Sequence, residues 1–292
     1  MILRWQTDPV LIGGTLTFAL LYGLLVGPLR GHLAPGAAFP KRQAVYFYTA
    51  LAFFYLAEGS PLHDLGELYL FSAHMVQHML LSYVVALLLL LGMPSWVLRP
   101  FLLNRYVAPF ARRLTHPVAA GLTFSLFFSV WHFPAVYEGA LGNALVHHSE
   151  HLLFIGTALL MWWPLLSPLP ELPRLSHVGQ LAYLFALPFG QFLVAALLTF
   201  SSEAIYPTYI AAPRITALSA LGDQQLGGVI MKGVGFIAFG VPFVLTFFRW
   251  YRSEQGSSPR SPVSRKHVRR EASEVTVDPP PSPSLYSRDA DA

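Results

Sequence analysis

Long apolar stretches are the feature that most constrains the fold of this chain. Hydrophobic residues make up 54% of the sequence and charged residues only 12%, about half the charged fraction of an average soluble domain. A helix that crosses a bilayer needs roughly 17–25 mainly apolar residues, and it satisfies its backbone hydrogen bonds internally. The stretches expected to do so are Val10–Leu29, Gln43–Ala57, Phe71–Met93, Pro117–Tyr137, His151–Leu169, Val178–Phe200 and Leu226–Trp250. The sequence therefore predicts an all-α fold, a polytopic membrane bundle of seven transmembrane helices.

The basic residues between these stretches predict how the bundle is oriented. Loops on the cytoplasmic side of a membrane carry an excess of Lys and Arg. With the N-terminus outside, only Arg4 and Arg214 fall in outer segments, Lys232 falls within the last span, and the other Lys and Arg residues lie on the inner side. We therefore expect the N-terminus outside and the C-terminus in the cytoplasm. Because this pattern accounts for the net charge of +4, we expect no nucleic-acid partner.

The last forty or so residues have a different composition from the rest. They are rich in Pro, Ser and charged residues, as in the run Pro279–Pro281. Such segments cannot bury a core and stay disordered. We expect residues 1–252 to form the seven-helix transmembrane domain and residues 253–292 to form a disordered, basic, Pro- and Ser-rich cytoplasmic tail.

Histidines gather at the outer ends of the predicted spans. With the orientation above, the histidines on the outer side are His63, His74, His78, His132, His147, His148 and His151. Histidine is expensive at membrane depth and usually has a function there. The spacing of His74 with His78, and of His147 with His151, places two imidazoles on one face of a helix. Because neighbouring spans run antiparallel, these ends should converge at one membrane surface.

The residue types in this cluster favour a copper ion. The chain has no cysteine, so thiolate sites and disulfides are excluded. Imidazole binds Cu, Zn, Fe and Ni, whereas the soft thioether of methionine, here Met75 and Met79, favours Cu(I). Three other interpretations remain open. The histidines could bond backbone carbonyls and lock the helices together, they could ligate a b-type haem as in a membrane cytochrome, or they could line the pathway of a membrane transporter.

Two further residues are candidates with more than one possible role. His132 precedes Pro134, which frees a helix carbonyl, so the imidazole could be a metal ligand or could hydrogen-bond to that carbonyl. Asp223 opens the last span, where it could cap the helix, ligate a metal through oxygen, or orient a ligating imidazole.

Several motifs together resemble the polytopic CtaG-type cytochrome c oxidase assembly factors. The most specific are Phe71–Leu81, which contains both His74 and His78, and Asp223–Met231. Supporting matches are His132-Phe133-Pro134 with Tyr137, His147 and His151, Trp162-Trp163-Pro164, and Tyr206-Pro207-Thr208-Tyr209. The resemblance covers about residues 8–250. At Lys232 the chain departs from the family, where tryptophan is expected.

The resemblance implies a role and a set of residues. It implies a non-enzymatic, multi-pass protein of the bacterial plasma membrane that helps to mature a haem–copper oxidase, with copper as the expected metal. Its partners would be the oxidase subunits and the lipid bilayer. The expected metal-site positions are His74, His78, His132, His147, His151 and Asp223.

Overall fold

The computed structural model describes residues 4–257, and helices are the regular secondary structure in that part of the chain. The chain divides into one compact unit, Met1–Trp250, and a second unit, Tyr251–Ala292. The helices are α1 (Pro9–Val26), α2 (Arg30–Leu33), α3 (Lys41–Gly59), α4 (Pro61–Leu68), α5 (Phe71–Met79), η1 (Leu80–Val85), α6 (Ala86–Gly92), α7 (Ser95–Leu102), α8 (Ala108–Leu114), α9 (Pro117–Trp131), α10 (Pro134–Leu141), α11 (Ala144–Leu166), α12 (His177–Phe200), α13 (Pro207–Ala211) and α14 (Ala220–Ser257). The all-α prediction is therefore confirmed.

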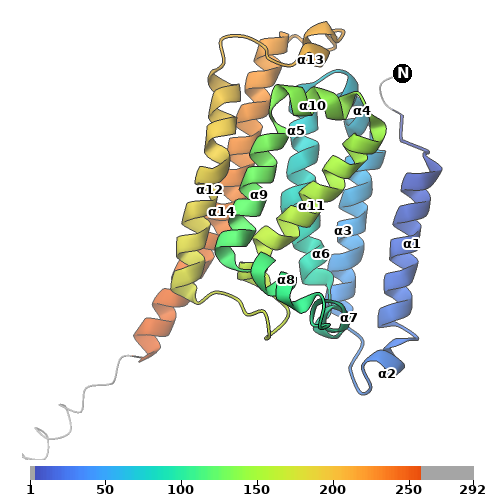
Figure 1. Cartoon of the computed structure of the whole chain (residues 1–292), viewed down its shortest axis with the longest axis vertical. Coiled ribbons are helices and arrows are strands. Elements are labelled where there is room, and N and C mark those ends of the chain that lie inside the picture. Colours follow the sequence, from blue (N-terminus) through green and yellow to red (C-terminus); the bar gives the residue numbers. More distant parts are fainter. Residues whose placement is uncertain (1–3, 258–292) are drawn as a thin grey trace, which may run out of the picture. The chain divides into compact units, whose positions relative to one another are not determined.

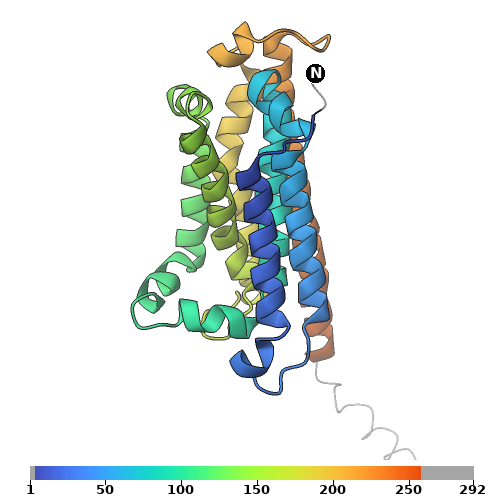
Figure 2. The same cartoon turned by 90° about the vertical axis from the view of Figure 1, so that its right-hand side faces the viewer.

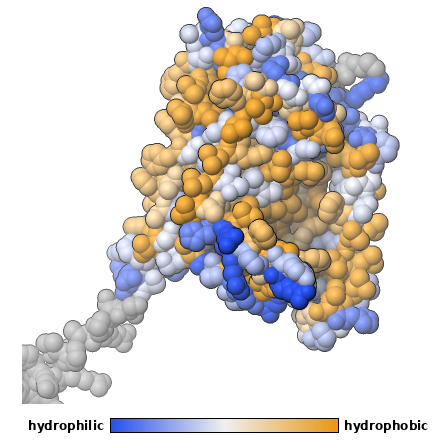
Figure 3. All heavy atoms as spheres, viewed as in Figure 1, coloured by the Kyte–Doolittle hydropathy of each residue, from blue (hydrophilic) through white to orange (hydrophobic). Residues whose placement is uncertain are grey.

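The chain is a multi-pass membrane protein. Within the described residues, five helical segments are long and apolar enough to cross a bilayer. They are α1, the continuous segment Phe71–Gly92, α11, α12, and residues Ala220–Gln255 of α14. A sixth span results if α8 and α9, which are bent by 74° at their junction, are taken together. Apolar residues cover most of the face seen between the two ends in Figure 3. The count of seven spans and the orientation stay predictions.

Some helix boundaries differ from those expected. Helix α9 ends at Trp131, well before the expected end at Tyr137, because Pro134 cannot continue the helical hydrogen bonds and instead begins α10. Helix α11 begins at Ala144, about two turns before the expected start at His151, because the Asn143 side chain caps it by accepting from the amides of Leu145 and Val146. His147 and His148 therefore lie inside α11. At the other end of the chain, α14 continues to Ser257, and most of the predicted disordered tail, residues 258–292, lies outside the described residues.

The segment Phe71–Gly92 contains a change of helical type. Between α5 and α6, residues Leu80–Val85 form the π-helix η1. The buried Trp162 on α11 donates its indole N–H to the carbonyl of Ser82 in this turn, at 3.1 Å. π-helical turns are rare and occur often at functional sites, and this one begins directly after His78 and Met79.

The arrangement of helices brings several of their ends to one region. Helix α11 packs against α9, η1 and α6, while α3 packs against η1, α6 and α1. The short helices α4, α10 and α13 all lie at the upper end of the bundle in Figure 1, and Figure 2 shows α1 and α3 side by side. At this end α4 lies tight against α5, because a Cβ on Gly66 would stand 3.0 Å from backbone atoms of His74. Side chains from α3, α4, α5, α10 and α11 can therefore meet here.

Candidate metal centre

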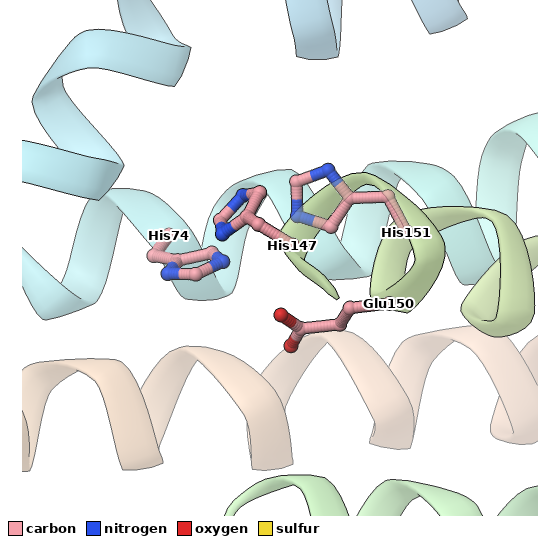
Figure 4. Close-up of side chains that lie close together, drawn as sticks. All are labelled: His74, His147, Glu150 and His151. Carbon is pink, nitrogen blue, oxygen red and sulfur yellow. The ribbon is translucent and has the colours of Figure 1, made fainter. Parts of the chain in front are cut away.

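Four buried side chains form a compact group of possible metal ligands. His74 comes from α5, and His147, Glu150 and His151 come from the first turns of α11. Each offers one nitrogen or oxygen, and these atoms lie within 4.8 Å of one another. None of the four residues is more than 3% exposed. Figure 4 shows the three rings and the carboxylate converging on a common space. The predicted convergence of the histidines is confirmed for these three, and the group could hold a metal ion.

His151 is held by a carboxylate on a different helix. Its Nδ1 donates a hydrogen bond to Glu58 at the end of α3, with N···O distances of 2.8 and 3.0 Å to the two oxygens. A neutral imidazole with its proton on Nδ1 carries a lone pair on Nε2. That Nε2 atom is buried and has no hydrogen-bond partner within residues 4–257. A carboxylate that fixes the tautomer and the orientation of an imidazole in this way is typical of metal-binding histidines.

His74 is held by a chain of tyrosine hydroxyls. Tyr209 on α13 donates to the carbonyl of Gly66 at 2.7 Å, so its oxygen is free to accept from Tyr137, 2.8 Å away. Tyr137 then accepts from Nδ1 of His74 at 2.6 Å. Burial raises the pKa of Tyr209, which keeps the terminal donor of this chain protonated. Because Nδ1 of His74 donates to this series of hydroxyls, the lone pair of the imidazole lies on Nε2. That atom is buried and has no hydrogen-bond partner in the described part of the protein.

His147, Glu150 and His78 complete the centre with polar atoms that have no hydrogen-bond partner. Among the described residues, both ring nitrogens of His147 and of His78 and both oxygens of Glu150 form no hydrogen bond within the usual distance and angle, although the indole N–H of Trp131 lies near enough to interact with the Glu150 carboxylate. Nε2 of His78 nevertheless lies only 3.3 Å from Oε1 of Glu150. Two ligands bonded to one ion at about 2.0–2.1 Å lie roughly 3.3 Å apart at a tetrahedral angle. Buried polar atoms are normally paired, so this arrangement is more typical of ligands around a cation than of a hydrogen-bonded core.

His132 lies deeper and faces a methionine. Its Nδ1 donates to the carbonyl of Phe128 at 2.6 Å, one turn earlier in α9. Its Nε2 therefore carries a lone pair, and it lies 3.3 Å from Sδ of Met75, which has no proton to donate. His132 thus bonds a helix carbonyl, although it is that of Phe128 rather than the one that Pro134 frees, and it directs its other nitrogen toward a soft thioether. Its role as a metal ligand stays a prediction. It is not one of the four grouped residues.

Asp223 has a structural position at this end of the bundle. Its side chain is fully buried and accepts from the backbone amide of Phe71 at 2.7 Å and from the amide and hydroxyl of Ser72. These are the first residues of α5, so Asp223 caps a helix distant in sequence rather than its own. Both of its oxygens are engaged in these bonds, and the structure does not place it with the four grouped residues.

Two other polar residues singled out by the sequence lie apart from the centre. His148 is exposed on α11 and bonds the carbonyl of Ala144. Lys232 on α14 has its Nζ atom 4.3 Å from the ring centre of Phe192 on α12, a cation–π contact. The histidines that converge therefore come from α5 and α11, with the end of α9 beside them.

Sequence reasoning missed the residues that surround the ligands. Glu58 and Tyr209 carry no periodic or spacing signal, because each acts across a contact between distant segments. Glu67 lies one helical turn after His63, an i,i+4 spacing that received no weight. The Pro-flanked His63 received little weight, yet its Nδ1 lies 3.0 Å from the side-chain nitrogen of Gln77 on α5. For Tyr209 the available signal was its place in the motif Tyr206-Pro207-Thr208-Tyr209.

Comparison with known proteins bears out the resemblance. A family model described as "Cytochrome c oxidase caa3 assembly factor (Caa3_CtaG)" matches residues 20–253. The chain is 25% identical over 276 residues to the uncharacterized proteins Mb0105 of Mycobacterium bovis and MT0111 of Mycobacterium tuberculosis, matches that cover 88% of this chain. It is 24% identical over 273 residues to the uncharacterized protein ML1998 of Mycobacterium leprae, with 86% of this chain covered. The chain spans about 40% of the length of these relatives. No solved structure matches it.

Proposed function

The chain belongs to the family of cytochrome c oxidase caa3 assembly factors, and on this basis we propose that it binds copper in the buried centre and delivers it to a haem–copper oxidase during assembly. Copper is the cargo of this process, and the protein holds and releases it without catalysing a turnover. His74, His147 and His151 would bind the ion through nitrogen and Glu150 through oxygen. His78, His132 and Met75 would form the wall next to them.

One observation carries the proposal. Donor atoms of four buried residues lie within 4.8 Å of one another, and those that face the centre have no hydrogen-bond partner in the described part of the chain. Leaving a buried polar group unpaired costs about 1–3 kcal/mol, and the cost is larger for charged groups. A cation bound between these atoms would remove that cost for all of them at once, and its positive charge would offset part of the negative charge of Glu58 and Glu150.

The donor types support copper as the ion. Imidazole nitrogen suits copper in both of its common oxidation states, and the thioether of Met75 beside His132 suits Cu(I) in particular. The absence of cysteine removes the thiolate ligands with which many zinc and iron–sulfur sites are built. The family description of an oxidase that contains copper points to the same metal.

The crowding of the centre favours an ion over haem. A porphyrin ligated by two histidines must fit as a wide, flat ring between them. Here the third imidazole and the Glu150 carboxylate both stand within 4.8 Å of the other donor atoms and would occupy that plane. A small ion needs no such space.

The proposal is tested by measuring copper in purified protein. The full chain in detergent is loaded with Cu(I), separated from excess metal, and its copper content is determined by mass spectrometry. Wild type should retain stoichiometric copper. The variant His74→Ala/His147→Ala should lose the bound copper. The variant Glu150→Gln should bind copper more weakly, although the glutamine side chain has nearly the same shape as glutamate. His148→Ala is the matched control, because it removes an exposed histidine of the same helix.

Three further measurements separate the possible outcomes. Equal elution volumes and melting temperatures of variants and wild type establish that copper is lost without loss of folding. Failure of wild type to retain copper would refute the proposed site, and a Soret absorption band in the purified protein would favour the haem alternative. In cells, the copper content and activity of the oxidase should fall in the His74→Ala/His147→Ala strain while His148→Ala behaves as wild type.

A further inference from the structure

We propose that His63, Glu67 and His147 form a second metal position, which receives the ion first and passes it to the buried centre through His147. This inference rests on the proposed function, because it describes how the buried copper site is filled. The structure holds the second group as a separate set of donors, each offering one atom within 4.8 Å of the others.

The three side chains are close enough to bind one ion together, through a carboxylate oxygen that contacts both imidazoles. Oε1 of Glu67 lies 3.2 Å from Nε2 of His63 and 3.1 Å from Nε2 of His147. Nevertheless Nε2 of His147 forms no hydrogen bond with any described residue. One carboxylate oxygen thus stands between two imidazole nitrogens at about the spacing that ligands of a common ion adopt.

The exposure of the side chains decreases from this group toward the centre. The side chain of Glu67 is 29% exposed and that of His63 is 12% exposed, whereas that of His147 is 2% exposed. His74, Glu150 and His151 are buried. An ion that arrives from solvent would therefore meet Glu67 and His63 before any ligand of the buried centre. The negative charge of Glu67 at this point also attracts a cation.

His147 belongs to both groups and is free to serve either. It is buried, and neither of its ring nitrogens has a hydrogen-bond partner within the described chain. Its ring centre lies 5.9 Å from that of His63 on one side and 4.4 Å and 5.3 Å from those of His151 and His74 on the other. No hydrogen bond to Nδ1 fixes this ring, in contrast to His74 and His151. It is therefore the ligand that can stay on the ion while the others exchange.

The fold holds the outer group against the centre through α4. Ser60 caps this helix and Pro61 begins it, and Gly66 lets it approach α5 closely. The side chain of Gln77 on α5 lies 3.0 Å from Nδ1 of His63. A glutamine amide can present either its nitrogen or its oxygen to a neighbour. In the structure the amide nitrogen faces Nδ1. With the amide turned over, its oxygen accepts from Nδ1 and Nε2 carries the lone pair toward Glu67.

The transfer itself is an exchange of ligands. The ion leaves the oxygen of Glu67 and Nε2 of His63, keeps its bond to His147, and gains Nε2 of His74 and of His151 and an oxygen of Glu150. No covalent bond within the protein changes, and the oxidation state of the metal is the same before and after.

The test is the rate of copper loading. The full chain in detergent is mixed with the coloured Cu(I) complex of bicinchoninic acid, and the loss of colour is followed by stopped flow. The final copper content is measured by mass spectrometry. In His63→Ala/Glu67→Gln the final content should equal that of wild type, while loading should slow by about tenfold, the lower end of what losing groups around a metal site usually causes. The isosteric variant Glu67→Gln alone should slow loading in the same direction.

A control variant and three possible outcomes separate this inference from the proposed function. His148→Ala/Glu203→Gln removes an exposed histidine and an exposed carboxylate and should load at the wild-type rate. Equal loading rates of wild type and His63→Ala/Glu67→Gln would overturn the inference while leaving the buried site intact. Complete loss of copper at equilibrium in a folded Glu67→Gln variant would also overturn it, because Glu67 would then belong to a single site. If wild type itself takes up no copper, it is the proposed function that fails.

Discussion

Replacing Glu58 by glutamine tests whether the buried centre binds metal through His151. Glu58 accepts the Nδ1 proton of His151 through Oε2 at 3.0 Å and is itself 6% exposed. Glutamine has the same shape and still offers an oxygen to this proton, but it carries no charge. The change therefore weakens one hydrogen bond and removes one buried negative charge while leaving the ligand in place.

The size of the effect follows from the kind of hydrogen bond that is changed. A hydrogen bond to a charged group contributes about 1.5–3 kcal/mol, and one between neutral groups about 0.5–1.5 kcal/mol. The difference of roughly 1–1.5 kcal/mol corresponds to a change in affinity of about tenfold. Loss of an outer partner of a ligating histidine typically costs about 10–100-fold in metal affinity, so both arguments predict a Cu(I) dissociation constant at least about tenfold higher in Glu58→Gln.

The assay is a competition between the full chain and a chromogenic Cu(I) chelator. The matched control is Glu138→Gln, which makes the same chemical change at the same end of the bundle. Glu138 accepts from the amide and the hydroxyl of Thr208 at 3.2 and 2.6 Å and belongs to neither group of possible ligands. An unchanged dissociation constant in Glu58→Gln, or an equal loss in Glu138→Gln, would refute the assignment of Glu58 as the residue that orients His151.

Three other substitutions test the surroundings of the centre. Tyr137→Phe should weaken Cu(I) binding by less than about tenfold, because Nδ1 of His74 still lies 3.1 Å from the Tyr209 hydroxyl. Tyr137→Phe/Tyr209→Phe should weaken Cu(I) binding by about 10–100-fold. Equal losses of affinity in the single and the double variant, measured by chelator competition, would contradict the role of the two hydroxyls. Gly66→Ala should lower the free energy of unfolding by about 1–3 kcal/mol by overpacking, and it should slow copper loading, because it pushes α4 away from α5; thermal melts and stopped-flow loading measure the two effects. Asp223→Ala should lower stability by about 1–2 kcal/mol through loss of a helix cap without changing the copper affinity of the folded protein; a large loss of affinity at full folding would instead make Asp223 part of the site.

The sequence predicted the convergence of the histidines well, for a physical reason. Helical periodicity places His147 and His151 on one face, and antiparallel packing brings that face to His74 on α5. Both arguments use only local spacing and the alternation of spans. They do not depend on how the intervening loops are folded, so errors in the boundaries of individual helices did not affect them.

The position of the helix boundaries was less predictable, although one signal was available. Asn143 is a strong capping residue, and the turn of helix that it begins holds His147. The span was instead placed by hydrophobicity alone, which excludes polar first turns. In a membrane protein the helix and its apolar part are not the same segment, and here the polar extension of α11 provides two of the four grouped residues, His147 and Glu150.

The partners of the ligands could not be predicted, because they depend on contacts between distant segments. Glu58 reaches His151 across 93 positions and Asp223 reaches Phe71 across 152. A capping role for Asp223 was foreseen only within its own helix. The close approach that Gly66 allows between α4 and α5 is equally invisible in the sequence, since a glycine near a helix end usually signals only a turn.

The distribution of fixed and free ligands matches delivery better than permanent storage. His74 and His151 are each held at Nδ1, by a tyrosine hydroxyl and by the Glu58 carboxylate, so their Nε2 atoms keep a defined direction. A purely structural metal site would be expected to fix all its ligands in this way. His147, whose two nitrogens form no hydrogen bond within the described residues, lies between these two and the more exposed Glu67, whose Oε1 lies 3.1 Å from Nε2 of His147. A site with two fixed imidazoles and one free imidazole at its entrance can bind an ion firmly and still offer a ligand that moves with it, so release should begin, like loading, at His147.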